Sequence, residues 1–192
     1  MKSVLISIRP QWVEKIANGE KTIEVRRTRP KLEVPFKCYI YETKGQYIKF
    51  IHGAHTKYGY GRGKVIGAFI CDRIEMVNAK CSNYGIDLFY HDCLTNGCLT
   101  EREIEKYFNV PEDRDLRAMK GNGYVWNISD LKIYDKPKEL SEFRKPCPYG
   151  DLPCWICPSC DKDENDNLIQ CFNTVSRPPQ SWQYIEDLGE KE

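Results

Sequence analysis

The sequence GEKTIEVRR, residues 19–27, alternates charged and apolar side chains over the length of a short strand. Successive side chains of a strand point to opposite faces, so Glu24 and Arg26 share one face while the isoleucine and valine beside them face a core. Lys21 stands at the start of the strand, where a turn can bring it to the same rim. An arginine held by a carboxylate is an oriented donor pair for a phosphate or a base edge. The same pattern also fits a solvated strand with an ordinary Glu–Arg pair.

Periodic patterns on both sides of this stretch predict a mixed α+β fold. Apolar side chains alternate over residues 3–8, as in a buried strand. Pro10 suits the first position of a helix, and Thr100 with Glu103 forms a capping-box pattern at the start of another. Further strands are predicted over 21–27, 37–42, 65–77, 123–135 and part of 176–188, and helices over 10–17, 99–108 and 112–119. Six or so short strands usually close into a barrel or a curled sheet with helices at its ends.

Composition limits the classes of function. The chain has 192 residues, of which 41% are hydrophobic and 30% are charged, so a packed core is expected. The net charge of +1 argues against nonspecific coating of DNA and confines any nucleic-acid site to a local patch. No stretch approaches the ~18 apolar residues of a membrane helix, and the first residues lack the apolar region of a signal peptide. We therefore expect a cytoplasmic protein of one domain with an elaboration, and no membrane partner.

The order strand, helix and then GxKxxExR over residues 19–26 resembles the signature of the ASCH family, within the PUA-like superfold. The similar segments are SIRPQWVEKIANGEKTIEVRR (7–27), GKVIGAF (63–69), GYVWNI (123–128) and RPPQSWQYIE (177–186). The last of these looks like the end of ASCH proteins from phages and Firmicutes. The resemblance divides the chain into an ASCH domain (1–135), a cysteine-rich extension (136–175) and a closing strand (176–192).

The resemblance implies a small PUA-like β-barrel with two or three helices and a cleft lined by Lys21, Glu24 and Arg26. It also implies binding of RNA or a modified nucleotide, with a regulatory role in translation or transcription. Arg9 and Lys64 are expected as neighbours of this site. Trp126 is expected either as a stacking wall or as a core residue.

An enzymatic function is the alternative that the resemblance leaves open. One ASCH branch is an amidohydrolase for acetylated cytidine with a threonine at the position of Glu24, and Thr22 lies on the wrong side of the alternation to replace it. Another branch cleaves single-stranded RNA. A hydrolase would use Lys21 and Glu24, with Asp72 and Glu75 as the nearest further carboxylates. A phage-type module that binds a host protein is a third hypothesis.

Residues 44–64 contain five Lys or Arg, five Gly and no acid, and are predicted to form a long basic loop, with a short hairpin inside it left open. Residues 78–98 are predicted to be irregular. In the basic loop, lysine and arginine side chains can contact the phosphates of a single-stranded RNA while tyrosine rings stack on its bases. The alternative is a flexible insertion whose aromatic rings pack on the barrel. The residues concerned are Lys44, Lys49, Lys57, Arg62 and Lys64, and Tyr47, Tyr58 and Tyr60.

Five of the ten cysteines lie between residues 147 and 171, which favours a metal site over scattered thiols. Cys154 and Cys157 are spaced as zinc ligands usually are, and Cys160 and Cys171 complete a set of four, with Cys147 as the substitute. Four thiolates leave no open position, so the zinc would be structural. Free thiols and an iron–sulfur cluster are the alternatives.

The other cysteines follow two patterns. Cys38 and Cys71 lie in apolar strands and are expected to fill the core. Cys81, Cys93 and Cys98 could form a second metal site with His91.

Overall fold

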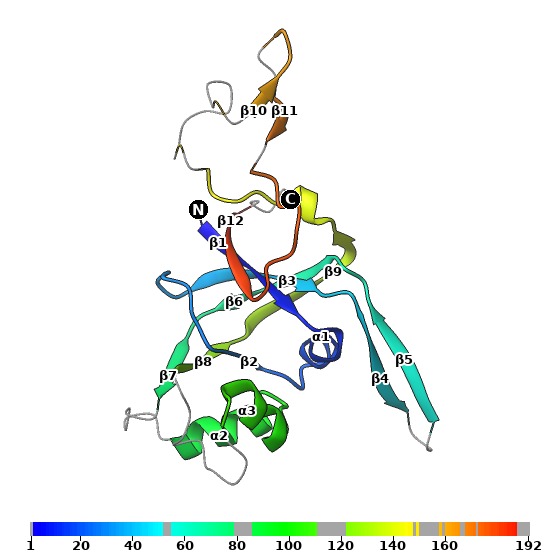
Figure 1. Ribbon diagram of the computed structural model, residues 1–192, viewed down its shortest axis with the longest axis vertical. Coiled ribbons are helices and arrows are strands. Elements are labelled where there is room, and N and C mark those ends of the chain that lie inside the picture. The colour runs from blue at the N-terminus through cyan, green and yellow to red at the C-terminus, as the bar shows by residue number, and fades with distance from the viewer. Residues whose placement is uncertain are drawn as a thin grey trace.

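The computed structural model describes residues 2–51, 55–78, 86–110, 122–147, 149, 158, 160–165, 168–171 and 173–187. They form a mostly β fold with helices at one side (Figure 1). The helices are α1 (Pro10–Ala17), α2 (Ile86–Thr95) and α3 (Glu101–Phe108), with a 3-10 turn η2 (Leu140–Glu142). The strands are β1 (Lys2–Ile8), β2 (Ile23–Arg26), β3 (Phe36–Glu42), β4 (Gly45–Ile51), β5 (His55–Gly61), β6 (Val65–Cys71), β7 (Ile74–Asn78), β8 (Asn122–Asn127), β9 (Ser129–Lys138), β10 (Cys160–Lys162), β11 (Leu168–Cys171) and β12 (Trp182–Glu186).

The central sheet has five strands in the order β12-β1-β3-β6-β9. β1 and β3 are parallel, whereas β12 pairs antiparallel with β1. The last strand of the sequence therefore lies beside the first. β1, β3 and β6 are buried nearly throughout, because the sheet is covered on both faces. Gly67 lies in β6 where a Cβ would approach the Lys132 carbonyl of β9 to 2.5 Å, so a side chain there would push the two strands apart.

A second sheet has the order β2-β8-β7, and two bends in the chain connect it to the first. The predicted strand 65–77 is in fact β6 and β7, and the predicted strand 123–135 is β8 and β9, so both single-strand predictions are wrong. At the bends, the Asn127 amide donates to the Asp72 carboxylate at 2.7 Å. Within the described residues the strand pairing forms no closed barrel, which corrects the expected barrel.

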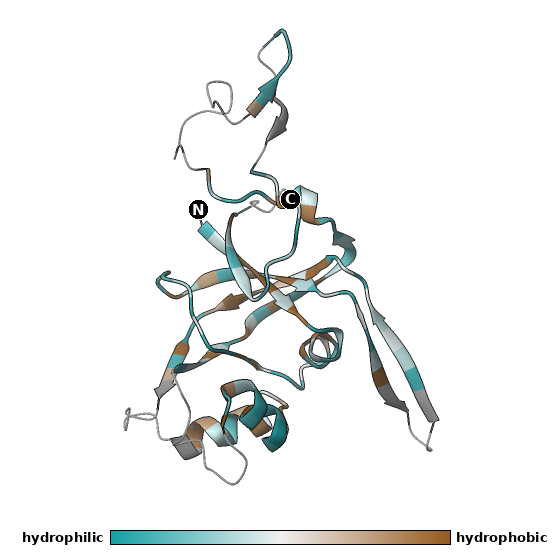
Figure 2. Cartoon of the chain, in the orientation of Figure 1, coloured by the Kyte–Doolittle hydropathy of each residue, from teal (hydrophilic) through white to brown (hydrophobic). Residues whose placement is uncertain are grey.

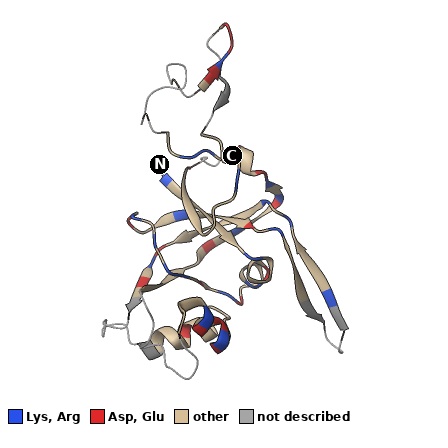
Figure 3. Ribbon diagram, in the orientation of Figure 1, with Lys and Arg blue, Asp and Glu red and all other residues tan. Residues whose placement is uncertain are grey.

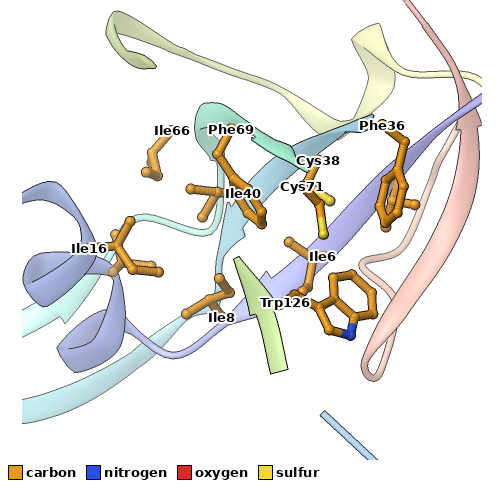
Figure 4. Close-up of a cluster of buried hydrophobic side chains, with 12 residues drawn as sticks. Ile6, Ile8, Ile16, Phe36, Cys38, Ile40, Ile66, Phe69, Cys71 and Trp126 are labelled. Carbon is orange, nitrogen blue, oxygen red and sulfur yellow. The ribbon is translucent and has the colours of Figure 1, made fainter. Parts of the chain in front are cut away.

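The main core lies between the sheets, where Figure 2 shows apolar residues concentrated on the strands. Figure 4 shows Trp126 of β8 beside Phe36, with Cys38 and Cys71 side by side on neighbouring strands. Trp126, Cys38 and Cys71 are fully buried, so Trp126 is a core residue and both cysteines fill the core as predicted.

The helices divide into two that the sequence predicted and one that it did not. α1 matches the predicted 10–17, and α3 begins at Thr100 with the predicted capping box. α2 lies in the stretch predicted to be irregular, which corrects that prediction. Its Phe89 packs edge-to-face on Phe108 of α3, with ring centroids 5.4 Å apart. The predicted helix 112–119 lies outside the described residues.

β4 and β5 pair regularly as a β-hairpin over residues 45–51 and 55–61, where the sequence predicted a long loop and left open a short hairpin inside it. Figure 1 shows this hairpin extending away from the central sheet, next to α1. The shorter β10–β11 pair lies at the opposite end of the molecule. None of the helices in the described part of the chain is long and apolar enough to cross a membrane.

Candidate functional site

β2 is buried on both faces, although its sequence is half charged. Ile23 and Val25 join the apolar cluster formed with α2 and α3, as the alternation predicted. Glu24 and Arg26 point the other way, toward the ends of β1 and β12, and are 7% and 8% exposed. The alternative of a solvated strand face is therefore wrong.

Lys21, Glu24 and Arg26 converge into one charged network. Glu24 Oε1 lies 3.0 Å from Arg26 Nε, and Glu24 Oε2 lies 3.4 Å from Lys21 Nζ. Lys21 is only 3% exposed, although it precedes the strand. A single carboxylate therefore stands between two buried cations, and the network carries one excess positive charge.

Lys21 is fixed by groups from three parts of the chain. Its Nζ donates to the Gly97 carbonyl at 2.9 Å and lies 5.7 Å from the centre of the Trp12 ring. Gly97 belongs to the turn after α2, and that turn is joined to β2 because Thr22 N donates to the Asn96 carbonyl. The turn that follows the unpredicted helix α2 therefore supplies the acceptor for Lys21.

Arg26 connects the two sheets. Its Nη2 donates to the Ser7 carbonyl of β1 at 2.7 Å, and its Nη1 donates to the Ser181 hydroxyl at 3.2 Å. Ser7 and Ser181 are themselves joined by a backbone hydrogen bond of 2.9 Å. The segment just before β12, far away in sequence, thus completes the arginine's surroundings.

Hydrogen bonding in the network is incomplete. Both ion pairs are close, yet neither is aligned as a hydrogen bond: Glu24 Oε2 and Arg26 Nε have no hydrogen-bond partner among the described residues. Buried polar atoms in native proteins are nearly always satisfied, so such atoms call for an explanation. Arg26 Nε already faces Glu24 Oε1 at 3.0 Å, so it is the excess positive charge of the network that suits an additional anionic group.

Tyr107 of α3 is a neighbour of the network that the sequence did not predict. Burial raises the pKa of its phenol, the Arg26 guanidinium acts to lower it, and the Glu24 carboxylate acts to raise it. The backbone of Arg27 also hydrogen-bonds this phenol. The side chain is 37% exposed, so it reaches from the buried network toward solvent. No charge or spacing in the sequence singles it out.

The other predicted site residues lie apart from the network. Arg9 is exposed at the start of α1, two residues after Ser7. Lys64 makes an ion pair of 2.7 Å with Glu139. The further carboxylates proposed for a hydrolase, Asp72 and Glu75, instead bond Asn127 and pair with Arg73, respectively. Tyr58 and Tyr60 are exposed on the β4–β5 hairpin.

The cysteines are only partly described. Cys154 and Cys157 lie outside the described residues, whereas Cys160 is paired directly with Cys171 across β10 and β11. Within the described residues, no three or more candidate metal ligands lie together. These residues do not include Cys154 and Cys157, two of the four predicted ligands.

One residue of the predicted second metal site, Cys93, lies in the core. Cys93 is fully buried with Phe89 and Ile104, and burial raises the pKa of its thiol to about 12. His91, on the same helix, is exposed. Cys81 lies outside the described residues.

A mixed five-stranded sheet and an antiparallel three-stranded sheet, joined by bent strands and flanked by helices, define an α+β domain. Three solved structures of ASCH from Zymomonas mobilis share this arrangement. The unmodified protein has a TM-score of 0.54 and 16% identity, over 96% of this chain and 88% of the Zymomonas chain. A tyrosine-to-phenylalanine mutant of it gives 0.53 and 17%, over 97% and 92%.

The chain therefore has the fold of an ASCH domain, which confirms the resemblance at the level of fold. No protein-family model matches the chain, and no curated protein matches it in sequence.

Proposed function

We propose that this protein binds RNA or a modified nucleotide, with a phosphate or another anionic group of the ligand at the network of Lys21, Glu24 and Arg26. The observation that carries the proposal is that two cations more than nine-tenths buried share one carboxylate. A buried charge without a partner costs several kcal/mol unless it is compensated. A bound anion offsets this cost, and such a site favours anionic ligands.

The surroundings of the network suit a nucleotide in particular. The Arg26 guanidinium is planar and held in a fixed orientation by Ser7 and Ser181, as recognition of phosphate or of a base edge requires. The phenol of Tyr107 supplies a hydrogen-bonding group on the solvent side of the network. Lys64 is left out of the proposed contacts because it is paired with Glu139.

Binding alone, and not hydrolysis, is the function that we propose. Among the described residues, the hydrogen bond and the ion pair of Lys21 go to Gly97 and Glu24. The expected signature of a hydrolase was a hydroxyl, a histidine or a second carboxylate facing Lys21. The Ser181 hydroxyl accepts a hydrogen bond from Arg26 itself.

The test measures the affinity for a fluorescein-labelled single-stranded RNA of mixed sequence and for single nucleotides. Lys21→Met and Arg26→Met remove one charge each while keeping most of the buried volume. The matched control is Lys136→Met, which removes an exposed charge from β9. We expect each network variant to weaken binding at least tenfold and the control to bind as the parent protein does.

Folding of each variant is checked by circular dichroism and thermal unfolding, because these residues also support the fold. Ser181→Ala provides a milder variant, since it removes only one acceptor from Arg26. It should weaken binding by a smaller factor in a fully folded protein. Folded network variants that bind RNA and nucleotides as well as the control would overturn the proposal.

We also propose a structural zinc ion in the C-terminal extension, held by Cys154, Cys157, Cys160 and Cys171, with Cys147 as the substitute. Support comes from the pairing of Cys160 with Cys171 across β10 and β11, which brings two candidate ligands together at the backbone level. Such short strands bury little apolar surface, so a metal would supply stability that a core does not. Metal analysis should give one zinc per chain; iron with visible absorption, or no metal, would reject it.

A further inference from the structure

One face of the β4–β5 hairpin carries exposed apolar side chains. Cross-strand partners lie on the same face of a sheet, and Ile48 is paired with Tyr58 while Gln46 is paired with Tyr60. Residues two apart on a strand also share a face, so these four residues form one surface, the tyrosine face. Ile48, Tyr58 and Tyr60 are 54%, 57% and 69% exposed.

The opposite face holds the hairpin against α1. The Tyr47 hydroxyl lies 3.0 Å from a carboxylate oxygen of Glu14 on that helix. The Tyr47 ring covers Gly59, and Gly61 lies so close to Pro10 and the Thr43 carbonyl that a Cβ would overlap both. The hairpin is therefore positioned by one face, and its tyrosine face is left to solvent.

This arrangement reverses the usual distribution of apolar side chains. A strand pair with one covered face normally places its large apolar residues on that face. Here the covered face carries glycines at 59 and 61, while two tyrosines and an isoleucine stand in solvent. Contiguous exposed apolar surface of this kind marks an interaction site.

The charge of the hairpin identifies the kind of partner. Residues 44–64 contain five Lys or Arg and no acid, and Figure 3 shows basic without acidic residues along the described part of β4 and β5. Of the carboxylates beside the hairpin, Glu42 accepts a hydrogen bond from Arg62 and Glu14 accepts one from Tyr47. Tyrosine rings on a strand pair that carries cations such as Lys57 and no acid suit a polyanion with flat, stackable groups.

We propose that the tyrosine face stacks the unpaired bases of a single-stranded RNA whose anionic group occupies the Lys21–Glu24–Arg26 network. This inference rests on the proposed function and makes the ligand an RNA strand with accessible bases, not a free nucleotide or a duplex. Tyr58 and Tyr60 lie about 6.8 Å apart along the strand, twice the spacing of stacked bases, so both rings can contact one RNA strand. Bases of a duplex are already stacked and paired, and cannot lie on the tyrosines.

The test compares Tyr58→Ala and Tyr60→Ala with the matched control Tyr149→Ala, which removes an exposed tyrosine elsewhere. The probes are a fluorescein-labelled single-stranded RNA of mixed sequence, the same RNA annealed to its complement, and a mononucleotide. Each hairpin variant should bind the single strand roughly tenfold more weakly. Tyr58→Phe and Tyr60→Phe should restore binding because they keep the ring. Mononucleotide affinity should not change.

The outcomes separate this inference from the proposed function. If Lys21→Met and Arg26→Met weaken RNA binding while the hairpin variants do not, the tyrosine face is rejected and the network remains the site. If only the hairpin variants weaken it, the network is rejected. Equal affinity of the parent protein for duplex and single strand would reject base stacking. Base stacking would also be rejected if the protein self-associates and Tyr60→Ala abolishes that self-association, because the tyrosine face would then bind protein.

Discussion

The Glu24 carboxylate lies 3.0 Å from Arg26 Nε, and both side chains are more than nine-tenths buried. With Lys21 on its other oxygen, Glu24 is the only negative charge in the three-residue network. The network joins β2 to β1, to the segment before β12 and to the turn after α2. Its stability and its proposed affinity for anions therefore depend on the same residues.

Glu24→Gln should destabilise the fold by about 3–5 kcal/mol, since it leaves two buried cations without a counter-charge. Urea unfolding measures this loss, and Glu75→Gln is the control because that carboxylate pairs with Arg73 at the surface. The double variant Glu24→Gln/Arg26→Met should lose less than the sum of the single losses. Strict additivity would mean that the two charges do not interact.

Alkaline pH should destabilise the protein through its buried thiols. Burial raises the pKa of both Cys71 and Cys93 from the ordinary 9.0 to about 12. Between pH 9 and 12 the unfolded chain loses these protons while the native state keeps them. Stability is therefore complete below pH 9 and falls above it, by about 1.4 kcal/mol per thiol and pH unit.

The measurement is urea unfolding between pH 8 and 11, compared with a Cys93→Ser variant. Its decline should be less steep, and the remaining slope comes from Cys71 and from Cys38, whose thiol pKa burial also raises. Iodoacetamide labelling of the native protein at pH 8 should also spare both thiols. Rapid labelling of Cys71 or Cys93 under these conditions would contradict their burial.

Gly61→Ala should destabilise the protein by about 1–3 kcal/mol, since its Cβ would overlap the Thr43 backbone and the Pro10 ring. Gly59→Ala should cost less, because there the new methyl group meets the Tyr47 ring, which can move. Thermal unfolding ranks the two variants. A Gly61→Ala protein as stable as the parent would show that α1 and the hairpin are not in close contact.

Thr100→Ala should cost about 1 kcal/mol, because the hydroxyl accepts from Glu103 N and closes the capping box of α3. Thr95→Ala is the matched control: its hydroxyl only donates back to the His91 carbonyl within α2. Chemical denaturation should show a shifted midpoint for the first variant and almost none for the second. Similar midpoints would mean that the cap does not stabilise α3.

Local patterns in the sequence were enough to predict α1, α3, β1, β3 and the alternation of β2. Each depends on neighbouring residues, such as Pro10 at a helix start or Thr100 with Glu103. α2 was missed because its stability comes from contacts such as that of Phe89 with Phe108, which lie far apart in sequence. Helix propensity and the spacing of apolar residues do not reveal contacts between segments that lie far apart in sequence.

The sequence by itself determined that Glu24 and Arg26 share a face and that Lys21 stands at the start of their strand. Only the tertiary structure decided that this face is buried, because α2 and α3 cover one side of β2 while β1 and the segment before β12 meet the other. It also divided residues 65–77 and 123–135 between two sheets. A strand's alternation fixes which side chains point together, but the surface that they meet depends on segments distant in sequence.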